Sequence, residues 1–344
     1  METIFAQKHT LHAGTAELYD GRLVDCFEKP ERVELILKHI RQSGLGPVGA
    51  PEAHGLDPLR RVHAVDYLEF LETAWADWSA LRGEGDALPT SWPVRSFSQQ
   101  RPAAIDGRLG FYSMDAATPI TSGTWEAALG AVDATLTALD QVQAGARGAY
   151  ALVRPPGHHA SRDVYGGYCF LNNAAIAAQR FVDETGGCVA ILDVDYHHGN
   201  GTQSIFYDRS DVLFLSIHGD PNQEFPYYLG YATEQGEGAG EGFNRNFPLP
   251  WGTTPARWFE ALRAAHRHIE AYQPDLLIVS LGVDTFRGDP ISHFLLDHDD
   301  FARMGQAIAG LALPTLFVQE GGYAVEEIGV NVVQVLGAFD AQVS

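Results

Sequence analysis

Short apolar runs alternate with longer amphipathic stretches through the middle and the C-terminal part of the chain. Five of the runs are rich in Val, Ile, Leu or Phe without polar alternation, as is typical of strands buried on both faces of a parallel sheet. The runs are Ala149 to Val153, Cys188 to Leu192, Val212 to Ile217, Asp275 to Leu281 and Pro314 to Val318.

The stretches between the runs carry apolar residues three or four positions apart, which is the period of an amphipathic helix. The period is clearest in two sets and less clean in Ala175 to Val182 and Pro255 to Ile269. The two sets are Trp125, Leu129, Val132, Leu136 and Leu139, and Val325, Ile328, Val332 and Leu336. Strands that alternate with helices of this length predict a doubly wound, mostly parallel α/β sheet with helices on both faces.

Two long segments interrupt this alternation. Gly83 to Gln100 contains Gly and Pro breaks around Trp92 and Phe97, and Gly219 to Gly242 holds Phe225 and three tyrosines before a glycine-rich stretch. Long loops inside a compact domain are often lids or binding walls, and the alternative is a flexible surface excursion.

The chain is strongly acidic. Its 344 residues carry 44 Asp+Glu against 23 Lys+Arg, for a formal net charge of −21. Nucleic-acid and anionic-membrane surfaces need basic patches, so both partners are excluded.

The N-terminal residues show no basic segment followed by an apolar run, and no stretch of about 18 uninterrupted apolar residues occurs, so we expect a cytoplasmic protein. One large domain fits the length as well as two ordinary ones.

Polar clusters follow four of the five predicted strands. RPPGHH follows the first and contains His158 and His159, and DVDYHHGNG follows the second. GVDTFRGDP follows the strand that ends at Leu281, and QEGGY, which ends in Tyr323, follows the last strand. Ligands of open α/β sheets collect beyond the C-terminal ends of the strands, so we expect one functional edge there.

Asp195, His197 and Asp284 form a candidate metal site. Asp195 and His197 are two positions apart beyond a strand end, so in extended backbone their side chains point to the same side. Two carboxylates and one imidazole leave a position open for water or substrate, which is the pattern of a catalytic site for Zn²⁺, with Fe²⁺, Mn²⁺ or Co²⁺ acceptable in its place. The alternative is that each Asp is a turn residue or a helix cap.

His158 and His159 are candidates for acid and base catalysis, because imidazole titrates near neutral pH. Asp193 is expected to fix the tautomer of one ring and raise its pKa, whereas the neutral Asn200 orients the other. Tyr323 follows two glycines, and a phenol there can donate a hydrogen bond to an oxyanion. The alternative is a core tyrosine that opens the last helix.

RPPGHH, GYCFLNN (Gly167 to Asn173), DVDYHHGNG, GVD and EGGY occur in an order that resembles the histone deacetylase superfamily. The resemblance implies one arginase/deacetylase-type catalytic domain over residues 1–344 and metal-dependent hydrolysis of an acetyl amide. It assigns the Zn²⁺ ligands to Asp195, His197 and Asp284, and the carbonyl-polarising role to Tyr323. It makes His158 and His159 the acid/base pair, for which we expect His159 as the base and His158 held charged beside Asp193.

The same resemblance implies a structural K⁺ ion. The residues that would hold it are Asp193, Asp195, His197, Ser216 and Ile217.

Within the superfamily, the insertion at about 83–100 and the stretch TPITSGTWEAA resemble the bacterial acetylpolyamine amidohydrolases. In that branch the insertion forms a homodimer interface and narrows the active-site tunnel. The expected substrates are therefore slender cationic amines such as acetylputrescine or acetylcadaverine. The candidate substrate contacts are the wall residues Tyr19, Tyr168, Phe225 and Ile291, and the rim acids Asp106 and Asp115.

Three other functions remain as alternatives. A protein acetyl-lysine deacetylase would share every catalytic residue. A non-catalytic binder of acetylated ligands would need no general base, and a binuclear ureohydrolase would need further metal ligands where this chain has His158, Asn200 and Tyr323.

Overall fold

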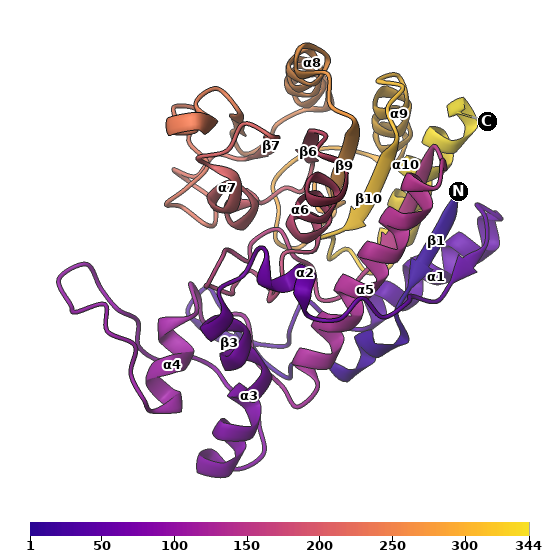
Figure 1. Cartoon of the computed structure of the whole chain (residues 1–344). Coiled ribbons are helices and arrows are strands. Elements are labelled where there is room, and N and C mark those ends of the chain that lie inside the picture. The colour runs from indigo at the N-terminus through magenta and orange to yellow at the C-terminus, as the bar shows by residue number, and fades with distance from the viewer. Residues whose placement is uncertain (344) are drawn as a thin grey trace.

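The computed structural model describes residues 1–343, and an eight-stranded parallel sheet lies at its centre (Figure 1). The strand order is β4-β1-β5-β10-β9-β6-β7-β8. The strands are β1 (Glu2–Phe5), β4 (Val48–Gly49), β5 (Gly148–Leu152), β6 (Val189–Asp193), β7 (Val212–Gly219), β8 (Asn244–Leu249), β9 (Leu276–Leu281) and β10 (Thr315–Gln319). A separate antiparallel hairpin pairs β2 (Glu17–Tyr19) with β3 (Arg22–Val24).

Helices cover both faces of the sheet, because alternate residues of each strand point to opposite faces. In β6, Val189 and Ile191 pack in one hydrophobic cluster, whereas Ala190 and Leu192 pack in the other. The first cluster includes residues of α2 (Asp57–Arg60), α3 (Val65–Arg82), α4 (Ile105–Phe111), α5 (Thr124–Gln143), α6 (Asn173–Thr185) and α7 (Asn200–Phe206). The second includes residues of α1 (Glu31–Ser43), α8 (Pro255–Tyr272), α9 (His298–Ala309) and α10 (Ile328–Val343). The predicted doubly wound α/β fold is confirmed.

The five predicted strands are β5, β6, β7, β9 and β10. The apolar pattern missed β1, β4 and β8. The first two are short, and β8 is an edge strand with the sequence NRNFPL, whose Asn244 and Asn246 side chains are buried and hydrogen-bonded. Two short 3₁₀ helices, Gln7–Leu11 and Gly238–Gly240, complete the elements.

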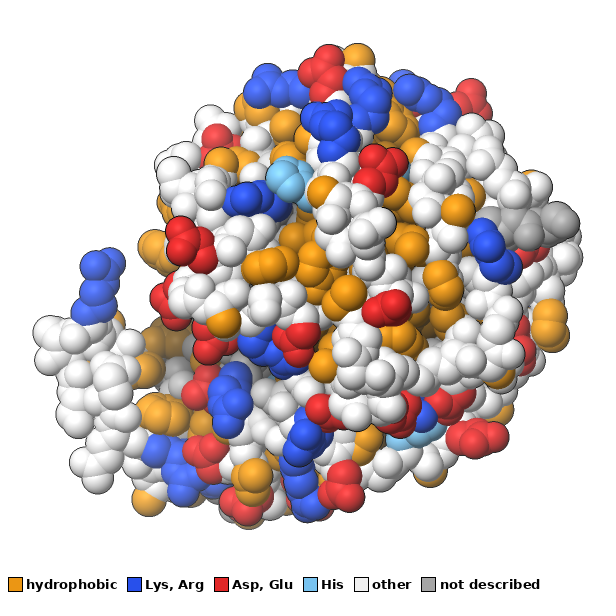
Figure 2. Space-filling view, turned by 45° about the horizontal axis from the view of Figure 1, so that its top comes forward, with side chains coloured by type: hydrophobic (Ala, Val, Ile, Leu, Met, Phe, Trp, Pro, Cys, Tyr) orange, Lys and Arg blue, Asp and Glu red, His pale blue; other side chains and the backbone are white. Residues whose placement is uncertain are grey.

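The segment 83–104 connects α3 to α4 and extends from the body as an arm, the purple loop beside α4 in Figure 1 and a separate lobe in Figure 2. Its base is held by the bridge between Ala87 and Ile120 and by Trp92 Nε1, which donates to Ser113 Oγ at 2.8 Å. Farther out, Val94 and Phe97 are 49% and 61% exposed. The arm therefore presents apolar surface that this chain leaves uncovered.

None of the helices described over residues 1–343 is long and apolar enough to cross a membrane.

Candidate active site

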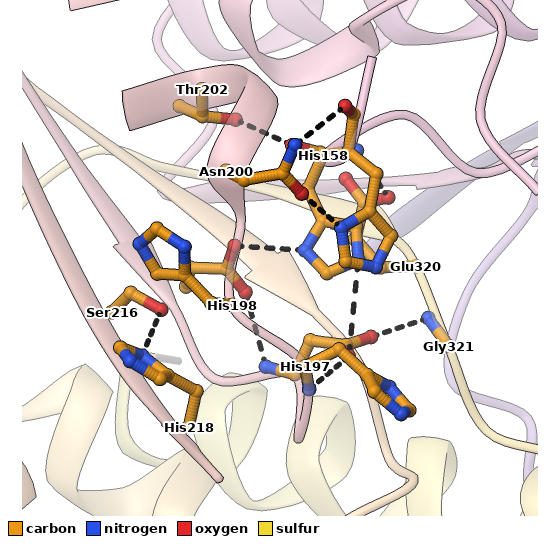
Figure 3. A network of polar contacts seen from close by, with 12 residues as sticks. His158, His197, His198, Asn200, Thr202, Ser216, His218, Glu320 and Gly321 are labelled. Carbon is orange, nitrogen blue, oxygen red and sulfur yellow. Dashed lines mark hydrogen bonds and ion pairs between the residues drawn. The ribbon is translucent and has the colours of Figure 1, made fainter. Parts of the chain in front are cut away.

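The four polar clusters lie at the C-terminal ends of β5, β10, β9 and β6, which are neighbours in the sheet. Their parallel pairing brings all four ends to one edge. Figure 3 shows part of the resulting network, with His158, His197 and Gly321 converging from three different segments. The sheet therefore assembles residues that are far apart in the sequence.

Asp195, His197 and Asp284 are buried, and one ligand atom from each lies within 4.8 Å of the others. His197 Nδ1 is 3.0 Å from Asp284 Oδ2 and 3.4 Å from Asp195 Oδ1. The second oxygen of each carboxylate accepts a hydrogen bond from the backbone. Asp195 Oδ2 accepts from Gly321 N at 2.7 Å, and Asp284 Oδ1 accepts from Tyr196 N at 2.8 Å. Hydrogen-bond donors behind a metal ligand fix its orientation.

The electrostatics of these three groups fit a divalent cation. Burial and the nearby Asp195 carboxylate raise the pKa of Asp284 well above its usual range. Burial acts to raise the pKa of Asp195 too, but the charges of His158 and His197 outweigh it and hold that pKa below its usual range. Two carboxylates this close in a buried site repel each other when both are ionised, and a proton or a cation between them relieves that repulsion. A Cβ on Gly321 would lie 2.5 Å from Asp195 Oδ2, so glycine is needed beside the ligands.

The two histidines lie side by side and are oriented differently. His158 Nδ1 is 3.0 Å from Asp193 Oδ2, and His159 Nδ1 is 2.6 Å from Asn200 Oδ1. Burial acts to lower the pKa of His158, but the carboxylates of Asp193 and Asp195 outweigh it and raise that pKa to about 10. Burial and the charge of His158 hold the pKa of His159 well below its usual range. The structure thus separates a charged ring from a neutral one.

Tyr323 is buried beside the candidate metal ligands. Its ring lies 5.5 Å from the Tyr168 ring, and the Arg32 guanidinium lies 4.6 Å from its centroid. Burial raises the pKa of Tyr323 well above its usual range, although Arg32 opposes this shift. The phenol therefore keeps its proton and can donate it to an oxyanion in a hydrogen bond.

Asp289 and Glu320 accept hydrogen bonds from the backbone of the loops at this site, and neither was predicted from the sequence. Asp289 Oδ2 accepts from Tyr323 N at 2.7 Å, and its Oδ1 accepts from Ile291 N at 3.1 Å. Glu320 Oε2 accepts from Gly157 N at 2.7 Å and from His158 N at 3.1 Å. Each acid sits inside a quoted motif, GVDTFRGDP or QEGGY, but its backbone partners include residues on a distant segment.

Aromatic side chains border the candidate catalytic groups. The Phe225 ring lies 5.2 Å from that of His159 and 6.2 Å from that of His197. Tyr168 has a φ of 66° and donates from its hydroxyl to Glu17 Oε1 at 2.8 Å. Burial raises the pKa of Glu17 to about 7, although the Tyr168 hydrogen bond opposes this shift. No motif marks Glu17, so only the structure reveals it.

The other predicted substrate contacts differ in their burial and in their partners. Ile291 is buried, whereas Tyr19 is exposed and packs on Phe27 at 5.2 Å. Asp106 pairs with Arg82 at 3.0 Å. Asp115 accepts from Gly167 N at 2.5 Å and from Ala117 N at 2.9 Å, so it orients a turn and is not a free rim acid.

The residues predicted to hold K⁺ are adjacent, since Asp193 pairs with Ser216 in the sheet and both are buried, as is Ile217. The Ser216 hydroxyl is 2.8 Å from His218 Nδ1, as Figure 3 shows. The K⁺ ion stays a prediction.

Comparison with known proteins identifies the class. The histone deacetylase domain model matches residues 26–339. The chain therefore belongs to the histone deacetylase family.

Within that family, the chain is similar to bacterial acetylpolyamine amidohydrolases. It is 57% identical over 340 residues to acetylpolyamine amidohydrolase 2 of Pseudomonas aeruginosa, covering 99% of each chain. It is 50% identical over 336 residues to the acetylpolyamine amidohydrolase of Mycoplana ramosa, covering 98% of each. The crystal structure of the acetylpolyamine aminohydrolase from Burkholderia pseudomallei superposes with a TM-score of 0.95 at 39% identity, covering 99% of each chain. The predicted resemblance is confirmed.

Proposed function

We propose that this chain is a metal-dependent amidohydrolase that removes acetyl groups from acetylated polyamines or diamines and releases acetate and the free amine. The observation that carries the proposal is the convergence of a three-ligand metal site, a histidine pair and Tyr323 at one sheet edge. The names of the similar bacterial proteins support the substrate class.

Asp195, His197 and Asp284 would hold the metal, Zn²⁺ by its donor set with Fe²⁺ or Co²⁺ acceptable, and when bound it would polarise the acetyl carbonyl and acidify water. His159 Nδ1 faces the Asn200 oxygen and so carries a proton, which leaves Nε2 free to accept one from the attacking water. The same nitrogen then returns the proton to the leaving amine.

His158 and Tyr323 complete the reaction. His158 stays charged beside Asp193 and stabilises negative charge as it develops. Tyr323 donates its phenolic proton in a hydrogen bond to the oxyanion, a contribution of about 3 kcal/mol for one well-placed donor.

The substrate preference follows from shape and charge. Phe225, Tyr168 and Ile291 offer apolar walls for methylene carbons, whereas Tyr19 and Asp106 are proposed at the entrance. The net charge of −21 attracts small cations. We further propose that two copies associate through the exposed arm, that K⁺ is held by Asp193, Asp195, His197, Ser216 and Ile217, and that the enzyme works in the cytoplasm as one domain.

A substrate comparison tests the proposal. Protein loaded with Zn²⁺ is incubated with acetylputrescine, acetylcadaverine, acetylspermidine and an acetyl-lysine peptide, and acetate release is measured. We expect kcat/KM to be highest for an acetylated amine. A strong preference for the peptide would favour the alternative, a protein acetyl-lysine deacetylase, and turnover without metal would overturn metal dependence.

A further inference from the structure

Phe225 packs against His159 and His197 although it belongs to the long loop Gly219 to Gly242. Within the described chain, Glu224 is the one residue of 221–229 whose side chain hydrogen-bonds outside this loop. The Asn222 side chain bonds to Asp220 inside the loop instead. Within 221–229, the side-chain attachment to the rest of the protein is therefore made by the residue next to Phe225.

The Glu224 carboxylate joins three groups. Its Oε2 accepts from the Tyr196 hydroxyl at 2.7 Å and from Trp251 Nε1 at 3.1 Å, and its Oε1 accepts from the Phe225 backbone N at 3.0 Å. Hydrogen bonds to an ionised acceptor are shorter and stronger than neutral ones. One side chain thus fixes the Phe225 backbone relative to Tyr196 and Trp251.

Tyr196 connects this carboxylate to the metal ligands. It lies between Asp195 and His197 in the sequence, and its backbone N donates to Asp284 Oδ1 at 2.8 Å. Its ring is fully buried, 5.0 Å from the His197 ring and 4.6 Å from the Phe294 ring. The tyrosine is therefore enclosed by packed side chains beside the candidate ligands, and its hydroxyl offers the loop a buried anchor.

The contact is tightly packed. A Cβ on Gly219, where β7 ends, would lie 2.9 Å from Glu224 Cγ and 3.0 Å from Tyr196 Cζ. Only a glycine leaves room for the two side chains to meet there. Gly219 at the end of the strand therefore leaves the space in which Glu224 and Tyr196 form their hydrogen bond.

We propose that Glu224 is a positioning residue that sets substrate specificity. Through Tyr196 it holds Phe225 over His159 and His197, and so keeps the approach to the metal ligands narrow. A narrow approach admits a slender acylated amine and excludes a bulkier acylated side chain. This inference rests on the proposed amidohydrolase function, because it names what that site selects.

Removal of the Tyr196 hydroxyl tests the hydrogen bond without removing a ring. For Tyr196→Phe and Glu224→Ala we expect KM for acetylputrescine to rise about tenfold and kcat to change less than about threefold, since the reacting groups are untouched. The preference for acetylputrescine over an acetyl-lysine peptide should fall by about tenfold. Glu224→Gln keeps an acceptor oxygen and should restore much of the preference.

Tyr231→Phe is the matched control, because the Tyr231 hydroxyl donates to Tyr227 O at 2.8 Å within the same loop and does not reach Tyr196. It should leave KM and the preference unchanged. Metal content is measured for every variant, because Tyr196 neighbours two ligands.

Amide hydrogen exchange of residues 220–230 gives a readout that needs no substrate. Protection should fall in Tyr196→Phe and Glu224→Ala, fall less in Glu224→Gln, which keeps one acceptor oxygen, and stay at the wild-type level in Tyr231→Phe. Unchanged protection in Tyr196→Phe would overturn the positioning role. If wild-type protein hydrolyses no acetylated amine, the proposed function fails while the exchange result still decides whether Glu224 holds the loop. Lost protection with unchanged substrate preference would overturn the specificity role alone.

Discussion

Replacement of Tyr323 by Phe isolates one hydrogen bond in the proposed reaction. The phenol is buried, and burial raises its pKa well above the usual range, so the wild-type hydroxyl stays protonated throughout the neutral pH range. The variant loses this donor and gains no charge.

The structure indicates that little else changes in this variant. The ring contacts with Tyr168 and Arg32, at 5.5 Å and 4.6 Å, do not involve the hydroxyl. The backbone N of residue 323 keeps its hydrogen bond to Asp289 Oδ2. The ring is therefore expected to stay in place, and the effect to fall on the transition state.

Loss of one oxyanion donor lowers kcat by about 10²- to 10³-fold, equivalent to about 3–4 kcal/mol. We expect this loss in steady-state kinetics with acetylputrescine, with KM within about threefold of wild type because ground-state binding is largely kept. Metal content is the control. A kcat within tenfold of wild type, in protein with normal metal content, would refute the role assigned to Tyr323.

Three further outcomes are expected. His159→Ala should nearly abolish turnover while the metal content stays normal, because His159 hydrogen-bonds to Asn200 and is not one of the three candidate metal ligands. Loss of metal would contradict the assignment of the histidine pair. Chelator treatment should abolish activity, and added Zn²⁺, Fe²⁺ or Co²⁺ should restore it; a chelated protein that stays active would exclude metal catalysis. Burial raises the pKa of Glu17 from 4.5 to about 7, so its contribution to stability is complete below about pH 4.5 and is lost as the pH rises through about 7. As the pH rises between these values, the free energy of unfolding of Glu17→Gln, measured with urea, should increase relative to that of wild type by at most about 3 kcal/mol. Equal pH dependence of the two proteins would refute the pKa shift.

The sequence predicted the part of the site that obeys regular geometry. Buried parallel strands have a readable apolar pattern, and their C-terminal ends must meet at one edge, so the polar clusters around His158, Asp195, Asp284 and Tyr323 could be expected together. The motifs then identified the family, because several of them occur in a fixed order.

The residues that hold the loops could not be predicted in this way. Glu17 and Glu224 act through partners that are remote in the sequence, and no periodicity links Glu224 to Tyr196. The same limitation explains why the hydrogen-bond and ion-pair partners of the two predicted rim acids could not be foreseen. Their position along the chain predicts Asp106 and Asp115 at the rim, whereas their partners, Arg82 and the backbone N of Gly167, are visible only in the folded structure.

The place of β10 in the sheet also bears on the order in which the candidate site can assemble. Residues Thr315–Gln319 lie between β5 and β9, so without them the strands form two separate groups, β4-β1-β5 and β9-β6-β7-β8. On a ribosome, β9 and β6 can bring Asp195 near Asp284 before β10 has been made. The contact of His158 with Asp193, across the missing strand, must wait for it. The candidate metal ligands can therefore come together without β10, whereas the candidate acid–base pair needs the C-terminal segment, whose Glu320 accepts from the backbone N of Gly157 and His158.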